Sequence, residues 1–145
     1  MKRPARGKAK TLKETDYRRL AEFRYLLRQF LLFGEQAAEE AGLTAQQHQA
    51  LLAMKGFGDA GPFTIGELAE RLGIRHNSAV GLVDRLLANS LIKRQSGADD
   101  RREVLLTLTP KADRLLARLS AAHHDELQRL APLLQGLLKH FGPSK

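Results

Sequence analysis

The 145-residue chain contains no cysteine, which excludes disulfide bonds, thiolate metal sites and redox switching through thiols. No apolar run approaches the length that spans a membrane, and no apolar segment follows the basic amino terminus. We therefore expect neither a transmembrane helix nor a signal peptide, and the expected compartment is the cytoplasm. With 43% apolar residues, the chain can form one domain around a substantial core.

The formal net charge of +8 is concentrated at the amino terminus. Residues 1–13 hold six Lys and Arg and no acidic residue, whereas residues 64–109 hold seven basic and six acidic residues and are nearly neutral. The first segment contains Pro4 and Gly7 and has no apolar periodicity, so we predict a disordered basic arm over residues 1–13. This arm either attracts the phosphates of a nucleic acid or is a solvated terminus.

Residues 64–73 predict a short helix. Thr64 followed by Glu67 is a capping-box pattern, in which each side chain bonds to the backbone amide of the other residue. The helix ends at Gly73 and has one apolar face, formed by Leu68, Ala69 and Leu72.

A second helix is predicted over residues 76–89, after a turn of three residues. At 100° per residue its apolar positions form one buried stripe of Ala79, Leu82, Val83 and Leu86. The opposite face carries Asn77 and Gly81, flanked by Ser78, Val80 and Arg85. Two short helices joined by a tight turn, with small and polar residues on the outer face of the second, fit the major groove of DNA.

A charged β-hairpin is predicted to follow. Residues 91–95 and 103–108 favour strands, and the polar segment 96–102 between them is too long for a tight turn. This segment therefore projects as a wing. Arg101 and Arg102 near its tip either reach a minor groove or neighbouring phosphates, or are ordinary charges of an exposed loop.

Two helices are predicted before this element. The first covers residues 15–41 and ends at Gly42, and Thr44 to Gln47 form a capping box for a second helix that reaches the glycine-rich loop 56–62. The glycines of this loop match the GxGxxG fingerprint of dinucleotide-binding proteins. The loop follows a helix instead of a strand, however, so it is interpreted as a connector. The first helix has an apolar stripe of Leu20, Phe23 or Arg24, Leu27, Phe30 or Leu31, Gly34 and Ala38.

After the hairpin, Thr109 caps a helix that begins with Pro110. Pro132 is expected to end this helix and to start another that reaches Phe141. These helices carry more leucines than a small monomer can cover, namely Leu127, Leu130, Leu133, Leu134, Leu137 and Leu138. Together with the first long helix they predict a dimerisation platform, and the alternative is an intramolecular bundle.

Four motifs in this order resemble the MarR (multiple antibiotic resistance regulator) family over nearly the whole chain, at residues 64–72, 78–86, 100–102 and 106–110. The resemblance implies a mainly α-helical fold with a small β-wing and a homodimer that binds a pseudo-palindromic DNA operator. It also implies a single domain over residues 14–145, with dimerisation helices at 14–43 and 110–145 and a winged-helix DNA-binding lobe at 44–109.

In the second helix of the reading element the sequence departs from a common family pattern. Gly81 stands where many members have an exposed Arg or polar residue, and Val80 stands where Thr is frequent. The residues expected to read DNA are therefore Arg75, His76, Asn77 and Ser78, with Val80 available for a thymine methyl group. Arg85 either contacts a phosphate or pairs with an acid. The family's Asp-x-Arg pattern, which organises the wing, corresponds here to Asp100 and Arg102.

By analogy with the family, a small aromatic or phenolic ligand is expected between the helices at 15–41 and 44–55. The residues near that position are Tyr17, Phe23 and Phe30, which are equally good core residues, and the 110–122 helix. Such a ligand releases DNA if it changes the distance between the two reading helices of a dimer. The alternative is constitutive DNA binding, and no cofactor is expected.

His123-His124-Asp125-Glu126 is not predicted to bind a metal, because adjacent histidines on a helix point about 100° apart. His48, His76 and His140 lie in other elements and show no ligand spacing. No nucleophile–base arrangement points to an enzyme. The expected function is a dimeric transcription regulator, most simply a repressor that a small molecule releases from its operator. The alternative is an architectural DNA-binding protein with little sequence preference.

Overall fold

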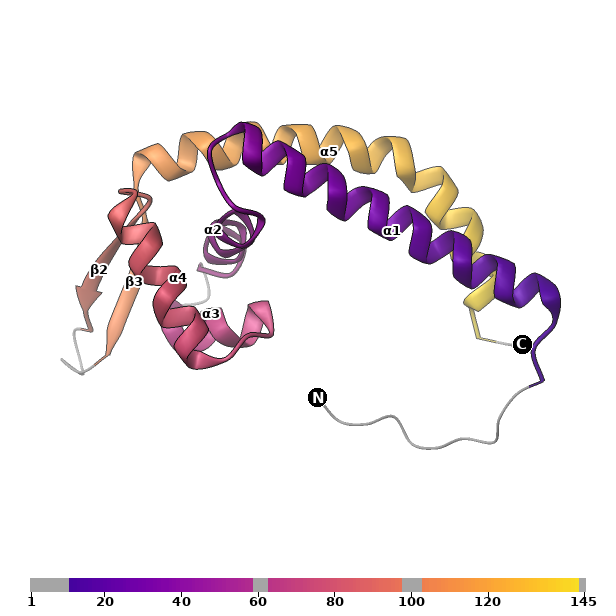
Figure 1. Ribbon diagram of the computed structural model, residues 1–145, viewed down its shortest axis with the longest axis horizontal. Helices are drawn as coiled ribbons and strands as arrows, with labels where there is room; N and C mark the ends of the chain where they lie inside the picture. Colours follow the sequence, from indigo (N-terminus) through magenta and orange to yellow (C-terminus); the bar gives the residue numbers. More distant parts are fainter. Residues whose placement is uncertain (1–10, 59–62, 98–102, 144–145) are drawn as a thin grey trace.

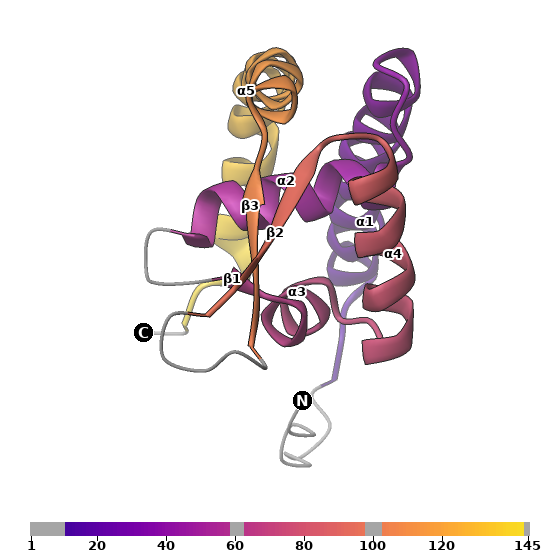
Figure 2. The ribbon, with the colours of Figure 1, turned by 90° about the vertical axis from the view of Figure 1, so that its left-hand side faces the viewer.

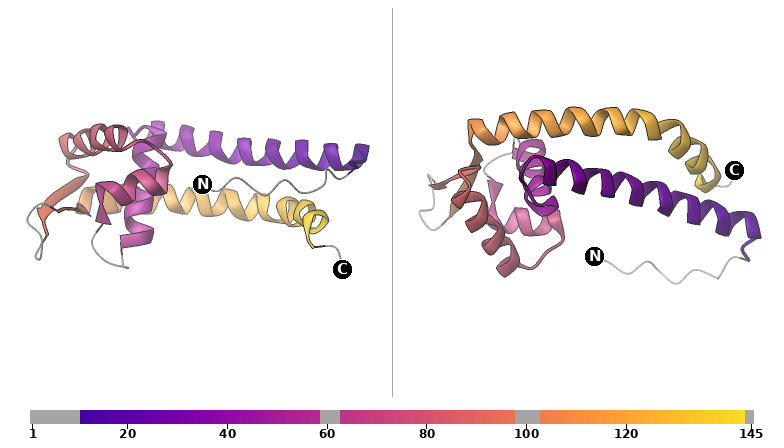
Figure 3. Two further views of the ribbon diagram at one scale, coloured as in Figure 1. Left: turned by 90° about the horizontal axis from the view of Figure 1, so that it is seen from below. Right: turned by 45° about the horizontal axis from the view of Figure 1, so that its top comes forward.

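The computed structural model describes residues 11–58, 63–97 and 103–143. Two long helices, α1 (Glu14–Glu40) and α5 (Pro110–Leu138), lie side by side and extend away from a smaller lobe (Figure 1). The views in Figure 3 show the same pairing of α1 with α5 along their length. This is the predicted architecture, mainly α-helical with flanking long helices and a small β-wing.

The lobe lies between these helices in the sequence. Its helices are α2 (Ala45–Phe57), α3 (Ile65–Leu72) and α4 (His76–Ala88). Its antiparallel sheet has the strand order β1-β3-β2, formed by β1 (Phe63–Thr64), β2 (Ile92–Ser96) and β3 (Val104–Leu108) (Figure 2). β2 and β3 form the predicted hairpin, whereas β1 is too short to have been predicted. A 3-10 helix, η2 (Lys139–Phe141), follows α5.

The predicted caps explain where α2 and α5 begin. The Thr44 hydroxyl accepts a hydrogen bond from the Gln47 amide at 3.1 Å, and the Gln47 side chain accepts one from the Thr44 amide at 3.0 Å. The capping box of α2 is therefore confirmed. At α5 the Thr109 hydroxyl accepts from the Ala112 amide at 3.3 Å, and Pro110 occupies the first turn, where its missing N–H costs nothing.

The capping box predicted at α3 is only half formed. The Thr64 hydroxyl accepts from the Glu67 amide at 3.2 Å, as predicted. The return bond from Glu67 is absent from the hydrogen bonds of the described residues, so this half of the prediction is wrong. Thr64 is also the second residue of β1 and pairs with Leu105 of β3, so its backbone belongs to the sheet as well as to the start of the helix.

The predicted helix break at Pro132 is also wrong. α5 continues to Leu138 with Pro132 inside it, and Figure 1 shows that the helix curves in its C-terminal part. A proline removes one backbone hydrogen bond and crowds the carbonyl four residues before it, which bends a helix when packing holds both sides. Leu130 is buried before the proline, and Leu133 and Leu137 after it line a groove shared with Leu26 of α1. The second part of α5 therefore still faces α1 beyond the proline.

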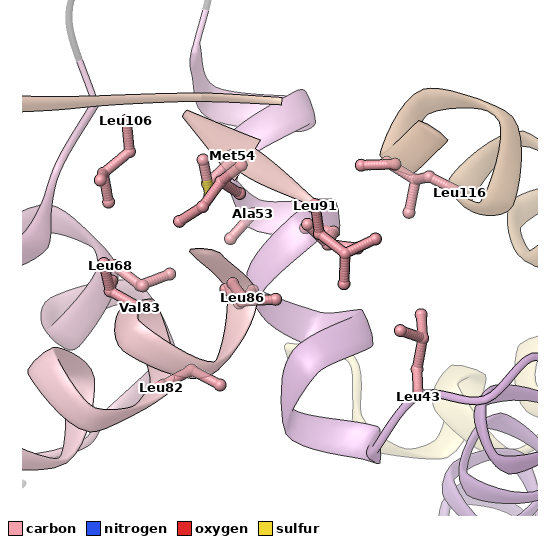
Figure 4. Close-up of a cluster of buried hydrophobic side chains, with 14 of the residues drawn as sticks. Leu43, Ala53, Met54, Leu68, Leu82, Val83, Leu86, Leu91, Leu106 and Leu116 are labelled. Atoms are coloured by element: carbon pink, nitrogen blue, oxygen red, sulfur yellow. The ribbon is translucent and has the colours of Figure 1, made fainter. Parts of the chain in front are cut away.

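The hydrophobic core lies in the lobe and at its junction with α5 (Figure 4). Leu116 of α5 and Leu43, just before α2, extend the core to the base of the long helices. The stripe predicted for α4 is confirmed, since all four of its residues are fully buried: Ala79, Leu82, Val83 and Leu86. Burying such side chains stabilises the lobe by about 1.5–3 kcal/mol for each Leu or Val.

Most of α1 lies outside this core, and Ala38 is its one buried residue. The stripe predicted on α1 divides between two faces. The half-buried face that includes Phe23, Leu26, Phe30 and Phe33 is turned inward, whereas Leu20, Leu27 and Leu31 are exposed. The single chain therefore leaves one apolar face of α1 uncovered.

Candidate nucleic-acid interface

The turn between α3 and α4 is tight because Gly73 adopts a left-handed conformation, with φ of 64°. In this conformation the amide of Gly73 donates to the Glu70 carbonyl at 3.2 Å, and the amide of Ile74 donates to the Ala69 carbonyl at 3.0 Å. Glycine accepts this conformation without the steric cost of a side chain. α3 therefore stops at Leu72, and α4 starts three residues after Gly73 and packs against α3.

α4 presents the predicted reading residues to solvent. Its inner face is the buried stripe, and Arg75 is its N-cap residue. Val80 is half-buried beside the buried stripe, and Gly81 is half-buried on the opposite side of the helix. Five of the predicted residues are exposed, namely Arg75, His76, Asn77, Ser78 and Arg85, and so are Asp84 and Ala88. The structure thus brings the predicted α4 residues together on the outward side of one helix.

The hairpin adds further positive charge. Lys93 and Arg94 are exposed on β2, which is an edge strand of the sheet. Lys93 and Arg94 were not among the predicted DNA-binding residues, although a run of polar residues on one strand of a predicted wing is a usable signal. The predicted wing residues Asp100, Arg101 and Arg102 lie outside the described residues.

Within residues 11–58, 63–97 and 103–143, the exposed cations of α4 and β2 form no ion pair with a carboxylate. Arg71 of α3 lies over the ring of Phe57, with its guanidinium carbon 3.8 Å from the ring centroid, a cation–π contact. The ion pairs among the described residues lie elsewhere in the molecule, at Asp16–Arg19, Lys55–Asp113 and Glu126–Arg129. The guanidinium groups of the outer face are therefore available to an anionic partner.

The three aromatics predicted to line a ligand pocket are not brought together in one chain. Tyr17 is 55% exposed near the start of α1, whereas Phe30 packs edge-on against His123 with ring centroids 5.8 Å apart. Residues with this separation in sequence lie about 20 Å apart along a helix. Phe23 is half-buried between them along the helix. A single pocket that contains all three side chains therefore does not exist within the described chain.

The histidines show no metal-binding cluster with the other described residues. No group of three or more His, Asp or Glu within residues 11–58, 63–97 and 103–143 has the arrangement to hold an ion. His124 is exposed, but His123 is half-buried and packs against His48 of α2. The contact of His48 with His123 could not be predicted from the sequence, because no local spacing links residues of different helices.

Two helices joined by a tight turn, the second with an exposed outer face, and a following hairpin define a winged helix-turn-helix protein. Comparison with known families agrees, since the sequence model of the MarR family matches residues 41–103. Over these residues the chain is similar to the MarR family, and its fold is that of a winged helix-turn-helix protein.

Curated relatives are similar to part of the chain. YfiV of Bacillus subtilis, described as an uncharacterized HTH-type transcriptional regulator, is 32% identical over 74 residues, which cover 51% of this chain and 46% of YfiV. The chain spans about half the length of the curated relatives it matches. Both of these relatives are described as uncharacterized HTH-type transcriptional regulators.

Solved structures share the fold. MepR, a transcription regulator of the Staphylococcus aureus multidrug efflux pump MepA, superposes with a TM-score of 0.68 at 20% identity, covering 77% of this chain and 81% of MepR. BpsR of Bordetella bronchiseptica, whose DNA binding is regulated by 6-hydroxynicotinic acid, superposes with a TM-score of 0.59 at 25% identity, covering 75% and 80% of the two chains. In the described part of the present chain, no helix is both long and apolar enough to cross a membrane.

Proposed function

We propose that this protein is a sequence-specific DNA-binding transcription regulator, acting as a repressor, which inserts α4 into the major groove. The observation that carries the proposal is the division of α4 into two faces. Ala79, Leu82 and Leu86 are 0% exposed on the inner face, whereas the residues from Arg75 to Ser78 are exposed on the first turn. The major groove is wide enough for one α-helix, whose first turn then meets the base edges.

Two further observations support this role. A MepR variant has been solved bound to an oligodeoxyribonucleotide, and it shares the fold with a TM-score of 0.66 at 20% identity. In our proposal the wing lies beside the reading helix, where Arg101 and Arg102 reach the minor groove or phosphates while Asp100 and Arg102 organise the loop. Lys93 and Arg94 of β2 add positive charge at the base of the wing.

The proposal includes a homodimer held by α1 and α5. An apolar groove of about 400 Å³ between these helices, lined in part by Tyr25, Leu26 and Leu133, offers a place for side chains of a second copy. The exposed large apolar residues on α1, α5 and η2 are Tyr17, Leu20, Tyr25, Leu27, Leu31, Leu32, Leu127, Leu133, Leu138 and Phe141. Apolar surface of this extent on a small protein marks an interaction surface.

A two-fold dimer matches the geometry of DNA. It presents two copies of α4 to successive major grooves, which are about 34 Å apart on one side of the duplex. The operator is then pseudo-palindromic, because the symmetry of the protein is repeated in its site.

We further propose that a small aromatic or phenolic ligand releases the dimer from its operator. The regulation of BpsR by 6-hydroxynicotinic acid supports this idea. A pocket of about 230 Å³ lies between α2 and α5, lined by Leu52, Leu116 and the ion pair of Lys55 with Asp113 at 3.1 Å. A ligand carboxylate that pairs with Lys55 in place of Asp113 removes an ion pair between α2 and α5 and changes how the two helices pack. Tyr17, Phe23 and Phe30 do not line this pocket in the single chain and act in ligand binding only if the second copy completes a site around them.

The proposed function is tested by measuring affinity for the DNA upstream of the protein's own gene and for random DNA of equal length. Arg101→Ala and Arg102→Ala should weaken binding to both DNAs by about 1–2 kcal/mol per site. Asn77→Ala and Ser78→Ala should instead change the preference between the two DNAs. If both kinds of variant respond identically on both DNAs, the proposed division of roles is wrong.

An architectural protein with low sequence specificity is the second candidate, favoured by the basic amino terminus and the nearly neutral lobe. The salt dependence of the DNA affinity separates the two candidates, because a non-specific binder loses most of its affinity as the salt concentration rises. A non-specific binder also leaves no footprint on DNA. Deleting residues 2–11 tests the arm, since each phosphate contact adds roughly 0.9 to the magnitude of the log–log salt slope. A footprint that persists in the deleted protein, together with a shallower slope, supports the specific regulator.

A further inference from the structure

The side chain of Arg85 lies next to Gly81 on the surface of α4. A Cβ atom built on Gly81 lies 3.7 Å from Nη1 of Arg85, so the guanidinium group of Arg85 lies in van der Waals contact with the position that a Cβ atom would take. The two residues are four apart and therefore neighbours on the helix surface. Long helical side chains point back toward the N-terminus, which carries the guanidinium one turn toward Asn77.

Arg85 has no acidic partner in the described part of the chain. Its side chain is exposed, and none of the ion pairs there involves it. The alternative that Arg85 pairs with an acid in the folded protein is therefore not supported. Its guanidinium group also lies near the centre of the outer face, because Gly81 and Asn77 are opposite the buried stripe.

We propose that Arg85, held over Gly81, reads a guanine in the major groove and makes a G·C pair part of each operator half-site. The inference deepens the proposed function and rests on it, since it requires α4 to enter the groove. A guanidinium group donates two parallel hydrogen bonds to O6 and N7 of guanine, which no other base accepts in the same way. Glycine at position 81 permits this arrangement, because a larger side chain there fills the space that the guanidinium group occupies.

The test is selection of binding sites from a randomised DNA library by the full chain, followed by sequencing. The wild-type protein should select a symmetric pair of G·C positions, with a preference on the order of 10- to 100-fold over other bases at each. Arg85→Ala and Arg85→Lys should lose this preference, although Lys keeps the positive charge. Gly81→Met should lose it as well, because the methionine displaces the guanidinium group while favouring the helix.

Controls separate base reading from general effects. Arg118→Ala removes another exposed arginine, on α5, and should leave the selected sequence unchanged. Thermal unfolding of each variant, followed by circular dichroism, verifies that α4 remains folded. Replacing the selected guanine by 7-deazaguanine removes N7 but keeps base pairing, and should weaken the wild type and not Arg85→Ala.

Two outcomes overturn the inference in distinguishable ways. If Arg85→Ala selects the same sequence as the wild type and only binds all DNA more weakly, Arg85 contacts phosphate and the inference alone fails. If the wild-type protein selects no sequence at all, the proposed sequence-specific function fails and the inference fails with it.

Discussion

The imidazole rings of His48 and His123 pack against each other with centroids 4.8 Å apart and planes tilted by 42°. His123 Nδ1 lies 2.6 Å from the Leu119 carbonyl oxygen and must donate to it, because a carbonyl only accepts. Phe33 of α1 packs on the same ring at 5.5 Å. His48 is 5% exposed, and within the described chain its Nε2 is buried without a hydrogen-bond partner. The pair thus lies where α1, α2 and α5 meet.

This contact predicts that acid destabilises the fold. Burial lowers the pKa of His48 below its ordinary value of 6.5, and the adjacent His123 lowers it further. The unfolded chain therefore binds a proton more readily than the folded chain. The contribution of His48 to stability is complete above pH 6.5 and is lost as the pH falls through 6.5 and then through the lower folded pKa. Urea denaturation at a series of pH values measures this loss.

A matched pair of variants tests whether His48 causes this loss of stability in acid. His48→Gln removes the titrating group and should flatten the dependence of the unfolding free energy on pH in this range. His124→Gln, which removes the exposed neighbour of His123, should leave that dependence as it is in the wild type. An unchanged slope in His48→Gln contradicts the prediction.

The close approach of α1 to α5 at Gly34 gives a second prediction. A Cβ atom on Gly34 lies only 2.9 Å from Nε2 of His123, and this ring is held by the Leu119 carbonyl and by Phe33. Gly34→Ala should therefore lower the unfolding free energy by about 1–2 kcal/mol, the usual cost of overpacking. This is the opposite of the gain of about 1 kcal/mol that Ala brings to an open helical position.

Gly56 of α2 is the control for this substitution, because nothing lies within 4 Å of a Cβ atom built there. Gly56→Ala should be neutral or stabilising. The double variant Gly34→Ala with His123→Ala should recover part of the loss, since it removes the opposing ring. If Ala changes the unfolding free energy equally at positions 34 and 56, the His123 ring rotates away at no cost and the prediction is wrong.

A third prediction concerns Ser90, which has a positive φ of 58° directly after α4. The amide of Leu91 donates to the Leu86 carbonyl at 3.0 Å, which fixes Ser90 in the left-handed turn that closes the helix. Ser90→Gly should raise the unfolding free energy by about 1 kcal/mol, because glycine avoids the cost of a side chain in this conformation. Asn89→Gly is the control, since Asn89 has a φ of −90° and glycine gains nothing there. Thermal melts of both variants test the prediction.

The fourth prediction addresses the uncovered face of α1. Leu31 is 50% exposed, and Leu27 is on the same face one turn earlier. Leu27→Glu and Leu31→Glu should convert the proposed dimer into a monomer, at a cost of about 2 kcal/mol or more for each buried charge. Sedimentation velocity at micromolar concentration measures the change. Leu52→Glu, an equally exposed leucine on α2, should leave the association state unaltered, and a folded monomer of the wild type contradicts the proposal.

The sequence by itself determined the elements that depend on residues three or four positions apart. The Thr44–Gln47 capping box and the buried stripe of α4 were both predicted and are present, because helix caps and amphipathic faces are local properties. The outer face of α4 follows from the same periodicity, so the candidate reading residues of this helix were predictable. The sign of the net charge and its concentration in residues 1–13 were likewise read directly from the sequence.

Only the tertiary structure decided which distant residues meet. The contact of His48 with His123, the two-residue strand β1 and the continuity of α5 through Pro132 depend on packing between segments far apart in the chain. The position of the Arg85 guanidinium group over Gly81 also required atomic geometry, since the sequence allowed either a phosphate contact or an acidic partner. Local patterns specify the conformation of a segment, but the burial of a side chain depends on the surfaces that fold against it.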